Sequence, residues 1–237
     1  MELSKRLQAV ANLLSEGLVV ADIGTDHGYI PIYLVETGKC QKAFAMDINK
    51  GPLVRAKEHI EAHGLQSQIT VRQSDGVKAL QIGECESVNV AGMGGGLAIK
   101  IMEDGKNIFK SLKEFVLQPQ SELEKVRQYL YENDYCIIAE DMVLEDGKFY
   151  PMMKVINGPV EPYSPAELRY GKILIKMKHP VLKMFLEKEV QAKKHIIENL
   201  KYEQGEHIKK RILEIETELS YIKEALNVYD SEEVHAL

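Results

Sequence analysis

Three acidic residues follow apolar segments at the places where β-strands would end. Asp22 lies near the end of the first segment, Asp47 ends the second, and Asp75 comes shortly after the third. Parallel strands end at one edge of their sheet, and open α/β sheets bind ligands along that edge. Carboxylates there accept hydrogen bonds from hydroxyl and amino groups. Acids at three successive strand ends therefore predict one ligand site rather than three unrelated turns.

The first acid opens a turn that leads from a strand into a helix, Asp22-Ile23-Gly24-Thr25-Asp26-His27-Gly28. Backbone amides and the helix N-terminus are expected to face whatever lies over the strand end. A dinucleotide site would carry glycine where Asp26 stands, and an anionic side chain there repels a pyrophosphate. It tolerates the ammonium and sulfonium of S-adenosylmethionine, so Asp22, Gly24 and Gly28 are predicted to bind that cofactor. The alternative is a turn that binds no ligand.

The second and third acids have separate predicted contacts. Asp47 stands 19 residues after Gly28, a spacing typical of an acid that binds ribose hydroxyls. It could instead cap the helix that contains Pro52. Asp75 and Gly76 stand where a methyltransferase presents an acid to the cofactor's adenine amine, although Asp-Gly is also an ordinary turn. Together the three acids predict S-adenosylmethionine as the cofactor.

The segment after the fourth apolar strand differs from that of enzymes that methylate exocyclic amines. Those enzymes carry Asn, Asp or Ser, then Pro-Pro and an aromatic residue, whereas this chain has Ala91-Gly92-Met93-Gly94-Gly95-Gly96. Glycine permits close approach of the backbone to a ligand, and methionine offers a polarisable apolar contact. Gly92 and Met93 are therefore predicted to contact the methionine part of the cofactor. A flexible loop before a helix is the alternative.

The elements that must position these residues follow from periodicity. Short β-branched or apolar segments alternate with helical patterns from about residue 18 to residue 120, the form of repeated βαβ units. The predicted parallel strands are 18–23, 42–47, 69–73, 87–91 and 114–118, followed by strands 135–144 and 149–157. The last two are joined through Asp146-Gly147, which predicts an antiparallel hairpin. This α/β plan is that of the Rossmann-like class I methyltransferase sheet.

The chain changes character near residue 160, where prolines precede a long helical pattern. We expect a methyltransferase domain over 1–160 and a helical domain over 161–237. Six apolar residues follow a heptad spacing: Ile208, Ile212, Ile215, Leu219, Ile222 and Leu226. A looser seam precedes Gly205, so the pattern predicts an antiparallel coiled-coil hairpin with arms about 33 Å long.

Composition restricts the class of protein. The chain has 237 residues, 45% of them hydrophobic and 28% charged, and no segment reaches the length of about 18 apolar residues that a membrane helix needs. Three cysteines without a CxxC motif argue against a disulfide framework and a zinc site. The first residues lack an apolar signal core. We therefore expect a cytoplasmic protein without a metal, and we favour a monomer.

Several strings of this sequence resemble those of a known family. They are Asp-Ile-Gly-Thr-Asp-His-Gly-Tyr-Ile-Pro (22–31), Ala-Gly-Met-Gly-Gly (91–95) and Gln118-Pro119-Gln120, together with Asp47 and Asp75-Gly76. The likeness is to the bacterial tRNA (adenine-22)-N1-methyltransferases, and it covers the predicted catalytic domain. It implies a class I methyltransferase domain with a C-terminal coiled-coil region. The implied reaction is methylation of ring nitrogen 1 of an adenine in the D-loop of tRNA.

That reaction needs little acid–base chemistry, because the ring nitrogen already carries a lone pair and positioning can provide most of the acceleration. The product base is cationic, so Asp26 is the first candidate to stabilise the developing charge, unless it only caps a turn. The target base must leave its stack, and Tyr29 is predicted to contact it, with Phe149 and Tyr150 as second choices. Core packing is the alternative for each ring. His27 could contact the cofactor's carboxylate or a phosphate, or only begin a helix.

Two sets of residues are predicted to bind the tRNA. Gln118 and Gln120 could hydrogen-bond the edge of the base, or merely form a turn around Pro119. The phosphates are assigned to basic residues, namely Arg6, Lys193, Lys194, Lys209 and Lys210. The net charge of the chain is −6, but residues 169–194 contain eight basic and two acidic residues, an excess of +6. A solvated helix face is the alternative.

Two other functions remain open at this point. The chain could methylate a small molecule or a protein, with the coiled coil as a dimerisation arm. It could also be a tRNA-binding module without turnover.

Overall fold

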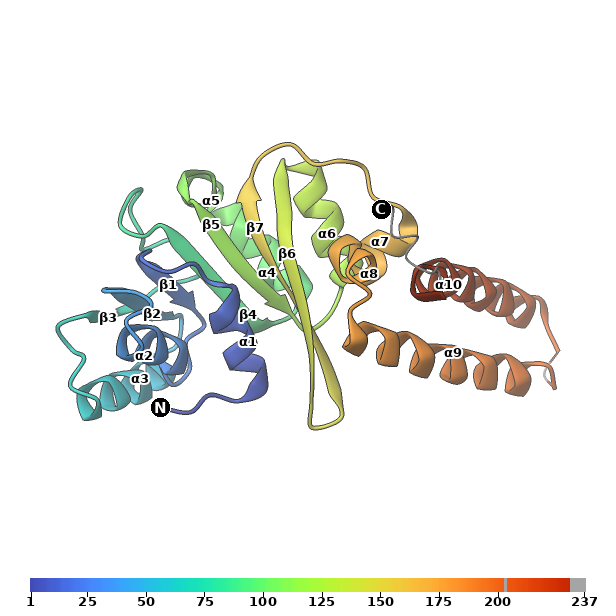
Figure 1. Ribbon diagram of the computed structural model, residues 1–237, viewed down its shortest axis with the longest axis horizontal. Coiled ribbons are helices and arrows are strands. Elements are labelled where there is room, and N and C mark those ends of the chain that lie inside the picture. Colours follow the sequence, from blue (N-terminus) through green and yellow to red (C-terminus); the bar gives the residue numbers. More distant parts are fainter. Residues whose placement is uncertain (203, 231–237) are drawn as a thin grey trace, which may run out of the picture. The chain divides into compact units, whose positions relative to one another are not determined.

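The computed structural model describes residues 1–202 and 204–230. The chain divides into two compact units, Met1–Pro162 and a second one that begins at Tyr163. The first unit is built on a seven-stranded sheet (Figure 1). Its strands are β1 (Val20–Ile23), β2 (Ala43–Asp47), β3 (Ile69–Gln73), β4 (Ser87–Met93), β5 (Glu114–Pro119), β6 (Tyr135–Glu145) and β7 (Lys148–Asn157).

The order of the strands is β3-β2-β1-β4-β5-β7-β6. The first five are parallel, whereas β7 runs antiparallel to both β5 and β6. The predicted class I methyltransferase sheet is thus confirmed. Strand order reverses between β1 and β4, and in such sheets the crevice at this reversal is where ligands bind.

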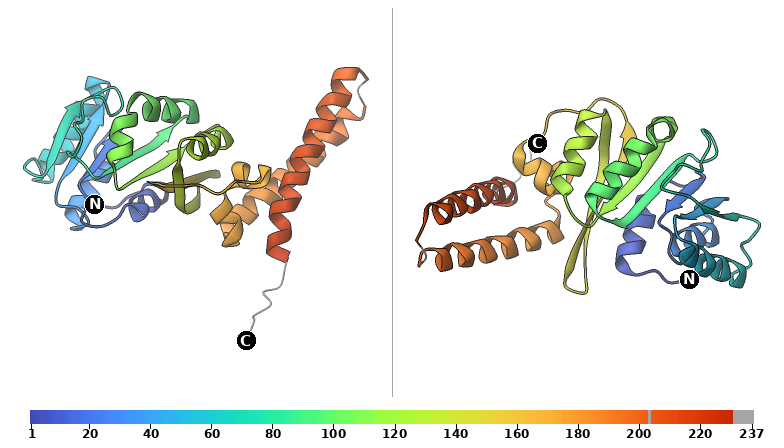
Figure 2. Two further views of the ribbon diagram at one scale, coloured as in Figure 1. Left: turned by 90° about the horizontal axis from the view of Figure 1, so that it is seen from above. Right: turned by 180° about the vertical axis from the view of Figure 1, so that it is seen from behind.

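Helices cover both faces of the sheet (Figure 2). They are α1 (Lys5–Leu13), α2 (Tyr29–Glu36), α3 (Lys50–Ala62), α4 (Gly95–Asp104), α5 (Lys106–Ser111) and α6 (Leu123–Glu132). Residues of α1, α2 and α3 share one hydrophobic core with Val116 of β5. On the opposite side, Phe109 and Tyr135 contact the ring of Phe115 edge-on. Neighbouring residues of a strand point to opposite faces, so Phe115 and Val116 tie both layers to β5.

The hairpin of β6 and β7 turns at Asp146 and Gly147, whose φ angles are 49° and 74°. Two left-handed residues are the signature of a type I′ turn, which Asp-Gly favours. The predicted hairpin is confirmed. Helix α1 packs against β6, and the backbone amide of Lys5 donates a hydrogen bond to Glu145 Oε1 at 2.6 Å. The hairpin therefore fixes the first turn of α1.

The second unit is helical and contains α7 (Pro165–Tyr170), α8 (Lys172–Lys176), α9 (Pro180–Leu200) and α10 (Glu206–Asp230). Helices α9 and α10 lie side by side as an antiparallel hairpin (Figure 1). Ile208, Ile215 and Ile222 of the heptad seam are buried. The predicted helical hairpin is confirmed, with arms of 21 and 25 residues.

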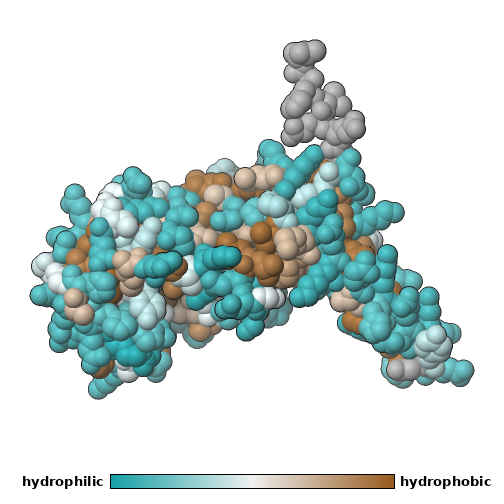
Figure 3. Space-filling view, turned by 60° about the horizontal axis from the view of Figure 1, so that its bottom comes forward, coloured by the Kyte–Doolittle hydropathy of each residue, from teal (hydrophilic) through white to brown (hydrophobic). Residues whose placement is uncertain are grey.

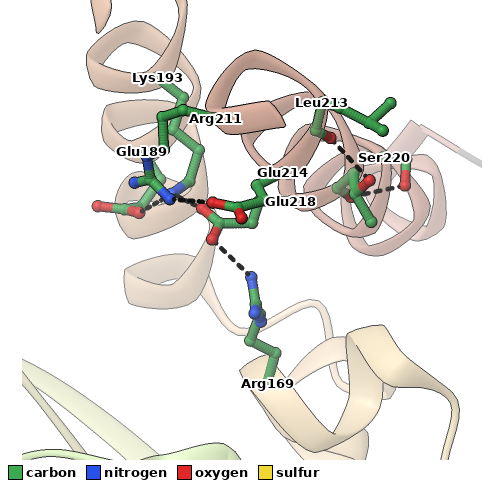
Figure 4. A network of polar contacts seen from close by, with 9 residues as sticks. Arg169, Glu189, Lys193, Arg211, Leu213, Glu214, Glu218 and Ser220 are labelled. Carbon is green, nitrogen blue, oxygen red and sulfur yellow. Dashed lines mark hydrogen bonds and ion pairs between the residues drawn. The ribbon is translucent and has the colours of Figure 1, made fainter. Parts of the chain in front are cut away.

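One lysine of this hairpin has a role that the sequence did not reveal. Lys193 was predicted to hold a phosphate, but its Nζ lies 2.5 Å from Glu218 Oε2 and 3.3 Å from Glu189 Oε2 (Figure 4). Arg169 approaches the other oxygen of Glu218 at 3.6 Å. Lys193 thus joins α9 to α10 through carboxylates, and we leave it out of the proposed phosphate contacts.

Hydrophilic residues cover most of the visible surface of the α9–α10 hairpin (Figure 3). Lys194, Lys209 and Lys210 are exposed and have no carboxylate partner among the residues described. Within 1–202 and 204–230, no helix is long and apolar enough to cross a bilayer. The side chains of these same residues include no group of three or more His, Cys, Asp or Glu that could hold a metal ion.

Candidate functional site

A pocket of about 320 Å³ opens where β1 and β4 end, at the reversal of strand order. It brings together residues from the β1–α2 turn, the end of β4, the segment after β5, and α1. The predicted site residues that line it are Arg6, Asp22, Gly24, Asp26, His27, Tyr29, Gly92 and Gln120. The sequence therefore identified most of this pocket.

Gly24 is required where β1 turns into the pocket. Its φ is +78°, and a Cβ built there would lie 2.2 Å from the Cε atom of Met93. The backbone amides of Gly24 and Thr25 both donate to the carbonyl of Met46, at 2.7 and 3.0 Å. The turn is thus held by β2, and Met93 packs against the glycine.

We expect Gly24→Ala to lower the free energy of unfolding by about 2 kcal/mol, as left-handed strain adds to displacement of Met93. Gly38→Ala is the matched control, because Gly38 has φ +72° with no atom within 4 Å of the added Cβ. It should cost about 1 kcal/mol from the backbone alone. Urea unfolding measures both. Equal losses would show that contact with Met93 adds nothing.

Asp22 is the buried acid of the pocket. The residue is 6% exposed, and Asn89 Nδ2 donates a hydrogen bond to its Oδ1 at 2.6 Å. Burial raises the pKa of Asp22 above its usual value, because removal from water disfavours the charged form. A cationic ligand group beside Asp22 would stabilise that charge.

Arg6 reaches the pocket from the first turn of α1. Its Nη1 donates to Gln118 Oε1 at 3.0 Å, and its guanidinium lies 5.6 Å from the centre of the Tyr150 ring. Gln118 is fully buried and is not part of the pocket lining, whereas Gln120 is. Gln118 and Tyr150, both considered as contacts of the base, each contact Arg6 in this structure.

Asp26 lies on the pocket rim with its side chain 59% exposed, and it forms an ion pair with Arg55 of α3. His27 Nε2 lies 3.4 Å from the second oxygen of the same carboxylate. No motif in the sequence pointed to Arg55, because it lies on a helix surface 29 residues away from Asp26. The cation restrains Asp26 and partly balances its charge.

Three rings stack beside Asp26. His27 lies 5.1 Å from Tyr29 and 5.3 Å from His59, and Tyr29 lies 5.5 Å from His59, measured between ring centres. His59 Nδ1 also lies 3.0 Å from the carbonyl oxygen of His27. Tyr29 is 38% exposed, so the alternative that this ring only fills the core is excluded. His59 was missed from the sequence for the same reason as Arg55.

Five predicted cofactor residues lie outside the lining of this pocket: Gly28, Asp47, Asp75, Gly76 and Met93. Asp47 Oδ1 accepts a hydrogen bond from the amide of Asn49 at 2.7 Å; the N-cap of α3 is Asn49, not Asp47. Asp75 forms an ion pair with Lys78, whose Nζ lies 2.5 Å from Asp75 Oδ2. Asp47 ends β2 and Asp75 follows β3, at the same edge of the sheet as the pocket, as predicted.

Comparison with known proteins connects this geometry to a family. Residues 20–224 match the family described as tRNA (adenine(22)-N(1))-methyltransferase. The chain is 35% identical to the enzyme of that name from Bacillus subtilis over 233 residues, which cover 96% of this chain and 98% of the relative.

Solved structures agree. The crystal structure of the B. subtilis m1A22 tRNA methyltransferase TrmK has a TM-score of 0.84 at 35% identity, and the match covers 94% of this chain and 98% of that one. The structure of M. capricolum TrmK in complex with S-adenosyl-homocysteine has a TM-score of 0.83 at 28% identity, covering 96% and 99%. The chain therefore belongs to the tRNA (adenine(22)-N(1))-methyltransferase family, as its motifs implied.

Proposed function

We propose that this chain transfers a methyl group from S-adenosylmethionine to ring nitrogen 1 of adenine 22 in the D-loop of tRNA. The observation that carries the proposal is the pocket at the ends of β1 and β4, in a chain that matches the B. subtilis enzyme over nearly its whole length. The first unit would perform the transfer, and the second would bind tRNA.

The residues of the pocket fit the charged groups of S-adenosylmethionine. The buried Asp22 carboxylate accepts a hydrogen bond from Asn89, and it suits a cationic ammonium. Asp47 would accept hydrogen bonds from the ribose hydroxyls, and Asp75 with Gly76 would lie against the adenine. When bound, the cofactor supplies an electrophilic methyl group on its sulfonium.

The target adenine would be turned out of its stack and placed against the rings of Tyr29, His27 and His59. Aromatic stacking on a base contributes about 1–3 kcal/mol per base. No general base is required at the ring nitrogen, so these side chains act by position. Asp26, on the rim beside the rings, would stabilise the positive charge that develops on the adenine.

Asp26→Asn should lower kcat about tenfold while leaving the Kd values for tRNA and cofactor nearly unchanged. The effect is smaller than the roughly 100-fold loss typical of a buried charge-stabilising group, because Asp26 is exposed and paired with Arg55. Steady-state kinetics at saturating tRNA measure it. Glu61→Gln, on an exposed acid paired with Lys57, is the control. An unchanged kcat would mean that Asp26 has no role in the transfer and serves only in the turn.

The tRNA phosphates are assigned to exposed lysines of the second unit, Lys194, Lys209 and Lys210. Such contacts release counterions and make binding depend on salt. We propose that the protein acts as a monomer in the cytoplasm, where its substrate is made.

The proposal is tested with labelled S-adenosylmethionine and tRNA that lacks modifications. Label recovered as 1-methyladenosine at position 22 is the expected result, and conversion of adenine 22 to guanine should abolish it. Label in another nucleotide would contradict the assigned position. Cofactor binding with no transfer to RNA would instead favour a small-molecule or protein substrate, or a binding module.

A further inference from the structure

Both oxygens of the Asp26 carboxylate are engaged on the pocket rim. Arg55 Nη2 donates to Oδ1 in an ion pair, and His27 Nε2 lies 3.4 Å from Oδ2. A charge with an opposite charge beside it acts on a third group only as a dipole, because the two Coulomb interactions nearly cancel. While Arg55 stays in place, Asp26 therefore gives little stabilisation to a positive charge on the target base.

An unpaired carboxylate on this rim would create a second difficulty, since it repels the substrate. RNA carries a phosphate on each nucleotide, and an adenine placed against the rings of Tyr29, His27 and His59 brings its own phosphates toward the same rim. Like charges at close range disfavour a complex, and the chain has a net charge of −6. The rim thus needs a cation while tRNA binds and a free carboxylate while the methyl group is transferred.

Arg55 lies where it can meet both needs. It precedes His59 by four residues in α3, so the two side chains lie on the same side of the helix. The Arg55 side chain is 45% exposed, and Asp26 accepts only one of its five N–H donors. A Cβ added to Gly51 would lie 3.8 Å from Arg55 Nη1, so the missing side chain leaves room next to that nitrogen.

The ion pair between Arg55 and Asp26 can be exchanged at little cost. Exposed pairs contribute little to stability, because water solvates both groups when they separate. Within residues 1–202 and 204–230, Asp26 is the only ion-pair partner of Arg55, although Glu58 lies three residues further along α3. The contact joins one nitrogen to one oxygen, whereas arginine commonly binds phosphate through two parallel hydrogen bonds. A phosphate can therefore replace the carboxylate.

We propose that Arg55 binds a phosphate next to the target adenosine, and that its transfer from Asp26 to this phosphate frees the carboxylate to face the base. The inference rests on the proposed function and adds a substrate-binding residue to it. Asp26 is paired in the free protein and becomes available only once a phosphate of the tRNA has bound. Since the pair that breaks is exposed, the exchange agrees with the nearly unchanged Kd for tRNA expected of Asp26→Asn.

Steady-state kinetics on the full-length protein separate this role from a structural one. Arg55→Gln should raise the KM for tRNA about tenfold, as expected for a lost charge-assisted hydrogen bond. It should leave kcat unchanged, because Arg55 is away from Asp26 in the wild-type complex as well. A residue that only holds Asp26 in place would give the opposite result, a lower kcat at an unchanged KM. Arg55→Lys should recover part of the affinity, since lysine binds phosphate as a point charge.

A tRNA with one neutral methylphosphonate linkage tests the phosphate itself. The linkage is placed on the 5′ or on the 3′ side of adenosine 22. One of the two should raise the KM of the wild-type protein about tenfold and have no effect on Arg55→Gln, because both changes remove the same contact. Lys57→Gln is the control, since Lys57 is exposed and paired with Glu61; this variant should respond to the linkage as the wild type does.

The transfer of Arg55 is tested by combining two variants. Asp26→Asn should lower kcat by the same factor in the wild-type and in the Arg55→Gln background, because Asp26 is unpaired in both complexes. A larger factor in the Arg55→Gln background would show that Arg55 stays on Asp26 during the reaction, and would overturn the transfer. Urea midpoints show whether each variant is folded.

Two results would overturn the phosphate contact: no effect of either methylphosphonate on the wild type, or equal effects on the wild type and Arg55→Gln. The second would mean that the phosphate is bound by another residue. Failure of the proposed function is distinct from both, because the wild-type protein would then leave adenine 22 of unmodified tRNA without a methyl group.

Discussion

A chain that ends at Pro162 should bind S-adenosylhomocysteine as tightly as the full-length protein but methylate tRNA roughly 100-fold more slowly or worse, since several phosphate contacts are lost together. Every residue that lines the pocket lies between Arg6 and Gln120. The sheet ends at Asn157, so the cut removes no strand. Calorimetry with S-adenosylhomocysteine and turnover on tRNA measure the two effects.

Charge variants of the full-length protein separate lost phosphate contacts from lost structure. Replacing Lys194, Lys209 and Lys210 with Gln should weaken tRNA binding and reduce its salt dependence by roughly 0.7–0.9 log units of slope for each contact. Lys193→Gln is the contrasting variant: it should destabilise the helical hairpin, because it leaves Glu189 and Glu218 without their shared partner.

An unchanged salt dependence of tRNA binding in the triple variant would mean that the hairpin does not contact the tRNA. Its apolar seam would then be better explained as an oligomerisation arm, and sedimentation would show a dimer. Full methylation activity by the shortened chain would contradict the proposed role of the second unit altogether.

Contacts close in sequence, or set by regular geometry, could be predicted without the structure. The turn 22–28 joins one strand to one helix, so its site residues necessarily lie at one strand end. The placement of Asp47 and Asp75 at the same edge of the sheet follows from the rule that parallel strands end together. The Asp146-Gly147 hairpin follows from local turn chemistry.

Contacts between distant elements could not be predicted in this way. Arg55 meets Asp26 only because α3 packs beside the β1–α2 turn, and no local pattern encodes that approach. Lys193 looked like a surface charge because the register of α9 against α10, which brings Glu218 to it, is fixed by packing. Gln118 was placed correctly at the end of β5, but its partner Arg6 comes from a helix 112 residues earlier.

Asp22 shows how the site conflicts with stability. Burial raises the pKa of Asp22 in the folded protein, so the folded state holds its proton more tightly than the unfolded state does. The contribution of this group to stability is therefore greatest below the unfolded pKa and declines as pH rises through the folded pKa. At neutral pH the ionised carboxylate opposes folding, and a bound ammonium would offset that cost.

Asp22→Asn should consequently raise the urea midpoint of the free protein at pH 7 while weakening S-adenosylhomocysteine about 100-fold, the upper range for a hydrogen bond to a charged group. In the wild-type protein, Asn89 Nδ2 lies 2.6 Å from Asp22 Oδ1. The asparagine keeps an oxygen that can accept this hydrogen bond, so the replacement removes charge with little change in shape. The stabilisation should vanish when the pH is lowered below the pKa of Asp22, because wild-type Asp22 is then neutral as well.

Asp47→Asn is the matched control for this prediction. Asp47 is a second acid at the same sheet edge, partly exposed and bonded to the amide of Asn49, so its replacement should weaken the cofactor without stabilising the free protein. Wild-type affinity in Asp22→Asn would mean that the cofactor's ammonium is bound elsewhere. Affinity lost together with a lowered urea midpoint would mean that the Asp22 charge supports the fold, and that burial is not the dominant effect on this carboxylate.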